Sequence, residues 1–409
     1  MSRADAHDPL APFRSRDYRR FSALALLAAM IERSQGVAIG WDVYERTGSA
    51  LALGVLGLVQ FLPVLMLFLP AGHLADRFDR RWVLLASFSA WGAANALLAV
   101  TSLTGGPAGW IYLAAAGLGS ALVINRPARD ALLAQLAPPE TLARAVAWNS
   151  SLFQFASVAG PAAAGTLIAA TGTASSVYLA NVGFAVLAAA IALAIRRRPI
   201  DHAARARSLR DLLAGVEHVW RTKPILGVIT LDLFAVLFGG ATALFPIFAK
   251  DILHVGPAGL GWLTAAPAVG ALAMAVVQGS APPLRRAGLV FVWAVAGYGL
   301  AMIVFGLSTW FWLSLAALVA AGALDNLSVV IRATVVQLYT PDALRGRVSA
   351  VNRVFISSSN ELGAFESGVL AAFIGPVATV VFGGVATIAL VLGALRLFPD
   401  LARLGRLRG

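Results

Sequence analysis

The feature that most constrains this chain is a series of long apolar segments joined by short polar or charged ones. A helix needs about 20 mostly apolar residues to cross the hydrocarbon core of a bilayer. Only helices and closed barrels can pair all their backbone groups there. The sequence therefore predicts an all-α membrane protein with twelve transmembrane helices, at residues 21–44, 50–71, 82–102, 110–133, 144–170, 174–195, 225–249, 257–281, 287–307, 310–337, 345–374 and 376–398.

The composition agrees with this prediction, because 59% of the 409 residues are hydrophobic and only 13% are charged. Ordinary soluble proteins carry about 25% charged residues. The net charge of +12 could indicate a nucleic-acid partner, but its distribution argues otherwise. In the predicted topology, Arg46 and Lys250 are the only Lys or Arg residues in outer loops, and the rest lie in cytoplasmic segments or inside predicted helices. We therefore expect a multi-pass protein of the cell (inner or plasma) membrane, with both termini cytoplasmic and no nucleic-acid partner.

The two halves of the chain resemble each other, because the pattern of residues 135–146 recurs at 337–348. Both copies lie between the fourth and fifth predicted helices of their half, as a six-plus-six duplication requires. The expected organisation is a cytoplasmic N-terminal segment (1–20), a six-helix bundle (21–195), a cytoplasmic linker (196–223), a second six-helix bundle (224–398) and a cytoplasmic tail (399–409).

The linker contains a segment whose apolar residues recur at helical spacing between 209 and 220. This pattern predicts an amphipathic helix. Such a helix could lie in the inner membrane interface. It could equally pack as a lid on the cytoplasmic mouth of the protein, and the pattern alone does not separate the two arrangements.

A densely charged stretch, residues 72–81, joins the second and third predicted helices and forces them to be antiparallel neighbours. Its pattern, Gly-x-Leu-Ala-Asp-Arg-x-Asp-Arg-Arg, resembles the signature loop of the major facilitator superfamily, although Asp79 stands where that pattern more often has Gly. Further stretches resemble the branch that holds the enterobactin-exporter and macrolide-efflux-type proteins: 13–20, 47–51, 340–348 and 361–368.

The resemblance implies two pseudo-symmetric six-helix bundles around a cavity that opens alternately to each side of the membrane. It also implies that the charged loop is a cytoplasmic gate, in which Asp76 meets the positive end of a helix dipole and the arginines pair with acids on neighbouring helices. The residues concerned are Gly72, Asp76, Arg77, Arg80 and Arg81. The alternative is that the arginines only fix the topology.

Catalytic and metal-binding patterns are missing from the sequence. There is no cysteine, and the five histidines are scattered. We find no Walker A motif, and no nucleophile elbow or zinc-protease motif. We therefore expect no enzyme activity, no catalytic residue, no cofactor and no metal site.

Ionisable residues inside predicted spans are costly and are often functional. The candidates for coupling or substrate binding are Glu32, Arg33, Asp232, Asp325, Glu361 and Glu366. Glu32 could bind a proton or cation, or it could form a structural ion pair. Adjacent positions on a helix point about 100° apart, so Arg33 should contact a different neighbouring helix from Glu32. Asp325 and Glu361 are favoured for a cavity, whereas Glu361 and Glu366 cannot act as one pair. Arg332 and Arg353 are expected to snorkel toward the inner interface.

The fifth predicted helix carries Gly160-Pro161-Ala-Ala-Ala-Gly165, which resembles the helix-5 motif of drug/proton antiporters, a marker of exporters. With the branch resemblance, this favours a monomeric, proton- or cation-coupled secondary transporter that exports amphipathic small molecules of the drug or siderophore type. Its partners would be the small-molecule substrate, the coupling ion and membrane lipid. The alternatives are metabolite uptake or facilitated diffusion, and, from a different class, a multipass membrane enzyme or receptor.

Overall fold

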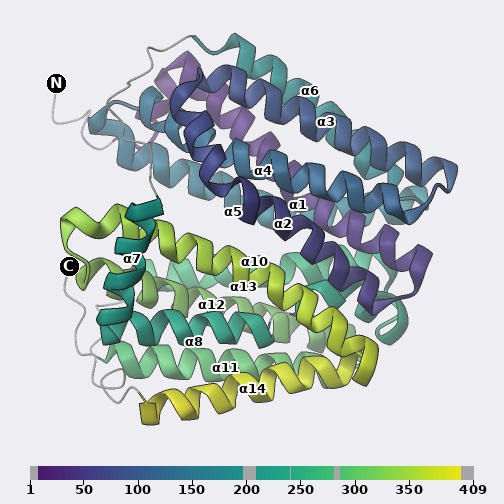
Figure 1. Cartoon of the computed structure of the whole chain (residues 1–409). Coiled ribbons are helices and arrows are strands. Elements are labelled where there is room, and N and C mark those ends of the chain that lie inside the picture. The colour runs from purple at the N-terminus through teal and green to yellow at the C-terminus, as the bar shows by residue number, and fades with distance from the viewer. Residues whose placement is uncertain (1–7, 197–208, 240, 281–285, 398–409) are drawn as a thin grey trace. The chain divides into compact units, whose positions relative to one another are not determined.

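The computed structural model describes residues 8–196, 209–239, 241–280 and 286–397. Within its helices, it leaves undescribed the side chains of residues 68, 69, 71–77, 209–213, 343, 350, 353, 354, 357 and 397. The described elements are all helical (Figure 1).

The long helices follow the apolar segments of the sequence closely. They are α1 (Arg16–Thr47), α2 (Ala50–Arg77), α3 (Arg80–Thr104), α4 (Ala108–Leu136), α5 (Pro139–Thr171), α6 (Ser175–Ala194), α7 (Leu209–Arg221), α8 (Lys223–Gly239), α10 (Gly256–Ser280), α11 (Ala287–Leu307), α12 (Phe311–Leu338), α13 (Arg345–Ile374) and α14 (Pro376–Leu397). Among the described residues, eleven helical segments are long and apolar enough to cross a membrane. The predicted span at 345–374 is a continuous helix, α13, but it is not one of the eleven.

The charged stretch at 72–81 is mostly helical rather than a loop. Helix α2 continues through Pro63 and Pro70 to Arg77, which leaves only Phe78 and Asp79 between α2 and α3. The Asp79 side chain caps α3, because it accepts a hydrogen bond of 3.0 Å from the backbone N–H of Arg81. Asp is a favoured N-cap residue, so this contact gives a structural reason for Asp79 where the family pattern more often has Gly.

The predicted helix at 225–249 lies within one apolar helical span, Lys223–Ile252, but it is not a regular α-helix throughout. Helix α8 is described as far as Gly239, and residues 241–252 form a 3₁₀-helix (Ala241–Leu244), a short α9 (Phe245–Ile247) and a π-helix (Phe248–Ile252). A side chain at Gly239 would collide with the ring of Tyr298, since an added Cβ would lie 2.6 Å from that ring. Pro246, which cannot donate a backbone hydrogen bond, follows soon after.

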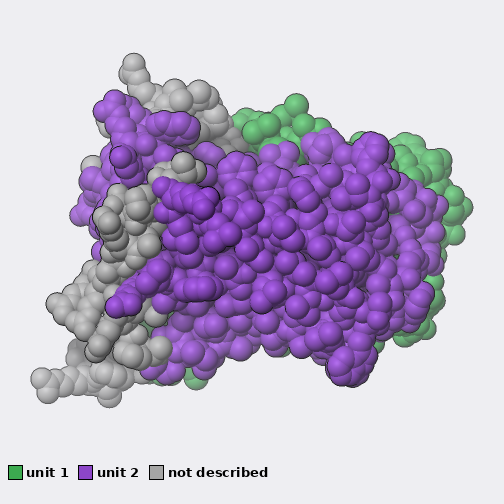
Figure 2. Space-filling model, turned by 90° about the horizontal axis from the view of Figure 1, so that it is seen from below, with its two compact units in different colours: residues 1–43, 59–207 green, residues 44–58, 208–409 purple. Residues whose placement is uncertain are grey.

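The chain divides into two compact units, which are coloured separately in Figure 2. Unit 1 comprises residues 1–43 and 59–207, and unit 2 comprises residues 44–58 and 208–409. In unit 1, α3 packs against both α4 and α6 (Figure 1). Trp91 of α3 is fully buried there and donates a hydrogen bond of 3.2 Å to the carbonyl of Leu118 in α4.

A chain of buried polar side chains also ties the helices of unit 1 together. Ser34 of α1 donates to the Asn181 side chain of α6 at 2.9 Å, and Asn181 donates to Asn95 of α3 at 3.3 Å. Asn125 of α4 donates to Ser87 of α3 at 2.8 Å. Such bonds hold membrane helices together where the hydrophobic effect between helices is weak.

Unit 2 is built around α12, which packs against α10 and α11, while α14 covers α11 and α8 (Figure 1). The amphipathic helix of the linker, α7, packs against α13. Val219 of α7 is buried in the core of unit 2, and Gly215 lies against the backbone of Arg347. These contacts seat α7 on unit 2, although Trp220 stays largely exposed.

The end of α1 and the start of α2 belong to unit 2, although they lie in the N-terminal half of the sequence. Tyr44 donates a hydrogen bond to the Asp251 carboxylate. Gly54 lies directly against Gly368 of α13, and a Cβ at Gly54 would come within 3.0 Å of the Gly368 Cα. The absence of side chains at these two glycines permits the close approach of α2 and α13.

Candidate functional site

Two clusters of charged side chains lie between packed helices, one in each unit. The unit 1 cluster is centred on Glu32 of α1. Its carboxylate forms an ion pair with Arg126 of α4, in which the Glu32 side chain is 10% exposed and that of Arg126 is 48% exposed. The guanidinium groups of Arg33 and Arg129 also act electrostatically on Glu32. The second carboxylate oxygen of Glu32, Oε2, is buried without a hydrogen-bond partner among the described residues.

As its helical position predicts, Arg33 meets a different helix from Glu32. Its guanidinium carbon lies 4.5 Å from the ring centre of Phe153 in α5. The predicted helix-5 motif makes this contact close, because a Cβ at Gly160 would lie 2.9 Å from the Arg33 Cβ. Pro161 and Gly165 are both buried, and α5 continues past them to Thr171.

Arg126 and Arg129 are missing from the predicted site residues. Both lie within α4, where the charges of both act on Glu32 of α1. A signal was available: the two arginines lie inside the predicted span 110–133, three residues apart, and therefore on one face of a helix. A pair of arginines on one face of an apolar helix indicates a polar partner inside the protein.

The unit 2 cluster joins α8, α11 and α12. Asp232 of α8 and Arg332 of α12 form a buried ion pair, with side chains that are 8% and 5% exposed. The prediction that Arg332 snorkels to the inner interface is therefore wrong. Its partner lies 100 residues away in the sequence, and the neutralisation of both charges outweighs the pull of the interface. Arg353 belongs to the residues whose side chains are not described.

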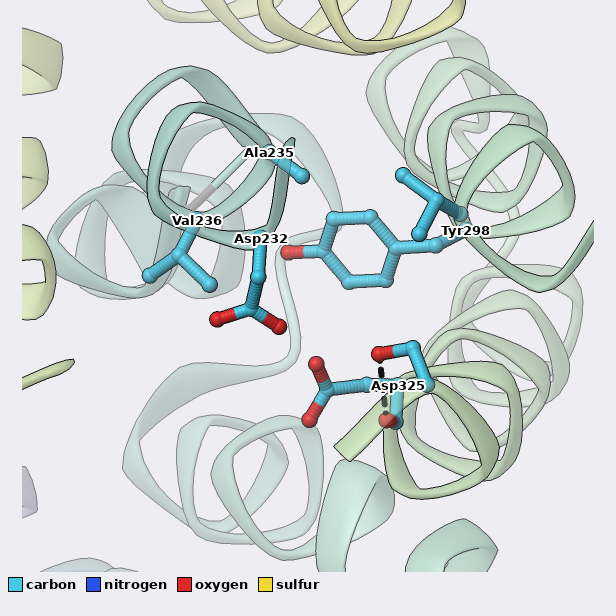
Figure 3. A pocket seen from close by; sticks show the side chains of 7 residues that line it. Asp232, Ala235, Val236, Tyr298 and Asp325 are labelled. Carbon is cyan, nitrogen blue, oxygen red and sulfur yellow. Dashed lines mark hydrogen bonds between the residues drawn. The ribbon is translucent and has the colours of Figure 1, made fainter. Parts of the chain in front are cut away.

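Asp325 of α12 faces Asp232 across a small cavity, which Tyr298 of α11 also lines. In Figure 3 the two carboxylates point toward each other, and the Tyr298 hydroxyl lies beside Asp232. That hydroxyl donates to the carbonyl of Gly239 at 3.0 Å. Among the described residues, no hydrogen bond or ion pair to the Asp325 carboxylate is found. Two facing carboxylates with one guanidinium leave one negative charge without compensation, which a proton or a monovalent cation could neutralise.

The remaining predicted residues, Glu361 and Glu366 of α13, do not line the cavity of the unit 2 cluster. The α13 backbone at Glu361 lies beside Gly57 of α2, and Glu366 accepts a hydrogen bond of 3.4 Å from Ser367. Of the predicted gate, the side chains of Gly72, Asp76 and Arg77 lie outside those that the structure describes.

Among the described residues, no acidic partner is found for Arg80 or Arg81, the two gate arginines whose side chains are described. Arg81 donates to the backbone carbonyls of Ala192, at 3.3 Å, and Leu193, at the end of α6. Carbonyls at the end of a helix lack intrahelical partners and carry the negative end of the dipole, so they bind a guanidinium as an acid would. Arg80 is buried, and its Nε and Nη1 atoms have no hydrogen-bond partner in the part of the chain that the structure describes.

Many apolar helices with ionisable groups buried among them are typical of a multi-pass membrane transporter. The chain belongs to the major facilitator superfamily, since the model of that family matches residues 21–364. This confirms the family and the fold class that the charged stretch and the apolar segments predict.

Curated relatives include the enterobactin exporter EntS of Shigella boydii serotype 18 and that of Citrobacter koseri. Each is 27% identical over 345 residues, which cover 83% of this chain and 80% of the relative. Similar solved structures include the nucleoside transporter NupG, with a TM-score of 0.71, 12% identity and coverage of 94% and 99%. A bacterial homologue of the human lysosomal transporter Spinster has a TM-score of 0.71, 15% identity and coverage of 95% and 98%. At these identities, the solved structures show the fold alone.

Proposed function

We propose that this protein is a secondary active transporter that exports amphipathic small molecules, of the siderophore or drug type, by alternating access. The observation that carries the proposal is the similarity over 83% of the chain to enterobactin exporters. The helix-5 motif, in which Gly160 packs against Arg33, agrees with an exporter. In this proposal the protein works as a monomer in the cell membrane, with both termini in the cytoplasm and the predicted six-helix bundles as its domains.

The proposed coupling ion is a proton, and the proposed coupling group is Asp325. Asp232 is already neutralised by Arg332, whereas the carboxylate of Asp325 faces Asp232 across a cavity. A proton on one of the two carboxylates removes their repulsion, so its arrival and departure can bias a conformational equilibrium. Glu32 is the second candidate, but its ion pair with Arg126 favours a structural or substrate-binding role.

Metabolite uptake or facilitated diffusion is the second candidate function. The fold is shared with a nucleoside transporter, and the fold alone does not set the substrate or the direction of transport. Cellular retention of the substrate distinguishes the two functions, because an exporter lowers it and an uptake carrier raises it.

The test measures the retention of labelled lipophilic drugs and a siderophore in cells that produce the wild type or Asp76→Asn. Asp76→Asn removes the charge of the proposed gate, so we expect a folded protein with at least about tenfold slower export. The expected result is low retention with the wild type alone, which a protonophore raises to the level of the variant. Transport by Asp76→Asn at the wild-type rate would contradict the gating role. Equal retention in all strains would contradict export of these compounds.

A further inference from the structure

The unit 1 cluster carries more positive than negative charge. Three guanidinium groups, those of Arg33, Arg126 and Arg129, act on the Glu32 carboxylate. Among the described residues, the only other carboxylate with a resolved electrostatic effect on Arg129 is its neighbour Asp130. The five groups (Arg33, Arg126, Arg129, Glu32 and Asp130) thus leave one positive charge in excess, within helices that are long and apolar enough to cross a membrane. An uncompensated charge is costly in such surroundings and is seldom retained without a ligand or a function.

The arginines also have unused hydrogen-bonding capacity. The Nε atoms of Arg33 and Arg129 are buried, and neither has a hydrogen-bond partner among the residues that the structure describes. A buried donor that has lost water and gained no acceptor is unfavourable. A bound carboxylate or sulfonate would supply acceptor oxygens and would also neutralise the excess charge. Guanidinium groups match the planar, two-oxygen edge of such anions better than ammonium groups do.

The cluster can be reached by a ligand and has an apolar side. The Arg126 side chain is half-exposed, although it belongs to a helix long and apolar enough to span the membrane. Arginines within such helices face water-filled or protein interiors rather than lipid, so the exposed part of Arg126 marks an aqueous approach. The ring of Phe153 lies under Arg33, and it offers an apolar surface beside the charged groups.

We propose that Arg33, Arg126 and Arg129 form a binding site for the anionic group of the cargo, and that this transporter selects amphipathic monoanions with an aromatic or aliphatic body. The proposal deepens the proposed function and rests on it for the identification of the ligand as cargo. Glu32 holds Arg126 in place and limits the excess to a single charge. An inside-negative membrane potential favours the outward movement of such an anion, in agreement with export.

A binding measurement tests this assignment without relying on transport. The full-length protein is placed in phosphatidylcholine nanodiscs and equilibrated with radiolabelled naphthalene sulfonate. Naphthalene sulfonamide, which has the same rings and no charge, serves as the competitor. We expect saturable binding of the sulfonate, with at least about tenfold weaker competition by the sulfonamide, because only the anion gains charge-assisted hydrogen bonds.

Variants separate a binding role from a structural one. Arg129→Gln and Arg33→Gln should each weaken sulfonate binding about tenfold or more. Glu32→Gln should tighten it, because the positive excess grows. Arg19→Gln is the matched control, since Arg19 is an exposed arginine of α1 that donates to the carbonyl of Phe13, and its affinity should equal that of the wild type. Equal affinity for the sulfonate and the sulfonamide, unchanged affinity in Arg129→Gln, or weaker binding in Glu32→Gln would each overturn the assignment.

Two further results distinguish a cargo site from a lipid site, and the anion site from the export function. If phosphatidylglycerol in the nanodiscs displaces the sulfonate, the site binds a lipid head group, and the assignment to cargo fails; persistence of binding supports it. Arginine-dependent binding in a protein that lowers the retention of no compound would contradict the export function while leaving the anion site intact. Export of neutral compounds by a protein that does not bind the sulfonate would contradict the anion site and support the export function.

Discussion

The two charged clusters of this transporter differ in sign, in burial and in what they lack. In unit 1, three guanidinium groups outnumber the nearby carboxylates, and the ion pair between Glu32 and Arg126 is partly exposed. In unit 2, two carboxylates share one guanidinium, and the ion pair between Asp232 and Arg332 is buried. The first cluster therefore suits an anionic ligand and the second a proton or cation. Under the two proposals made above, the two halves of the duplicated fold divide substrate binding and coupling between them.

The largest effect expected from this comparison is on stability. Arg332→Gln leaves the Asp232 carboxylate buried beside Asp325 without a positive partner, and we expect the free energy of unfolding to fall by about 3–5 kcal/mol. The loss should be greater at high pH, where both carboxylates are charged, than at low pH, where protonation removes their charge. The free energy of unfolding is measured by denaturation in detergent at several pH values, with tryptophan fluorescence as the signal.

A double variant provides the control for this stability loss. Asp232→Asn combined with Arg332→Gln removes both members of the pair, so most of the lost stability should return. If the double variant is as unstable as Arg332→Gln alone, the loss comes from packing and not from the uncompensated charge. That result would mean that the two clusters do not differ in how much their ion pairs contribute to stability.

The next effect is on coupling. Asp325→Asn keeps the shape of the side chain but removes the carboxylate that faces Asp232, so the protein should fold with stability equal to or above that of the wild type. Transport should lose its dependence on pH, because the proposed proton-binding group is gone. The measurement is the initial rate of export from proteoliposomes at a series of internal and external pH values. A wild-type pH profile in this variant would contradict the role of Asp325.

The smallest effect is expected at the corresponding carboxylate of unit 1. The ion pair between Glu32 and Arg126 is partly exposed, whereas that between Asp232 and Arg332 is buried. Glu32→Gln should therefore lower stability less than Arg332→Gln does, and transport should keep its pH dependence. The same denaturation and proteoliposome assays measure both quantities. If Glu32→Gln abolishes the pH dependence while Asp325→Asn keeps it, coupling belongs to the unit 1 cluster, and the proposed division of roles is reversed.

The order of the long helices could be predicted, and most of their ends lie within a few residues of the predicted ones. The predicted spans 287–307 and 345–374 coincide with α11 and α13, because apolar periodicity, a flanking polar turn and the glycine after Ile374 all mark the same ends. The 3₁₀ and π turns of residues 241–252 could not be predicted from the apolar pattern, which continues through them. Nor could the contact of the Tyr298 ring with Gly239, 59 residues away in the sequence.

The sequence by itself determined that this protein is a helical membrane transporter of the major facilitator superfamily, since the length and hydrophobicity of a segment decide whether it can enter a bilayer. The sequence also identified Glu32, Asp232 and Asp325 as unusual, because a charge inside an apolar helix is visible in one dimension. Only the tertiary structure decided which charges meet. Arg126 lies 94 residues from Glu32, and Arg332 lies 100 residues from Asp232. Their pairing depends on how helices pack and rotate against one another, and no local pattern records that geometry.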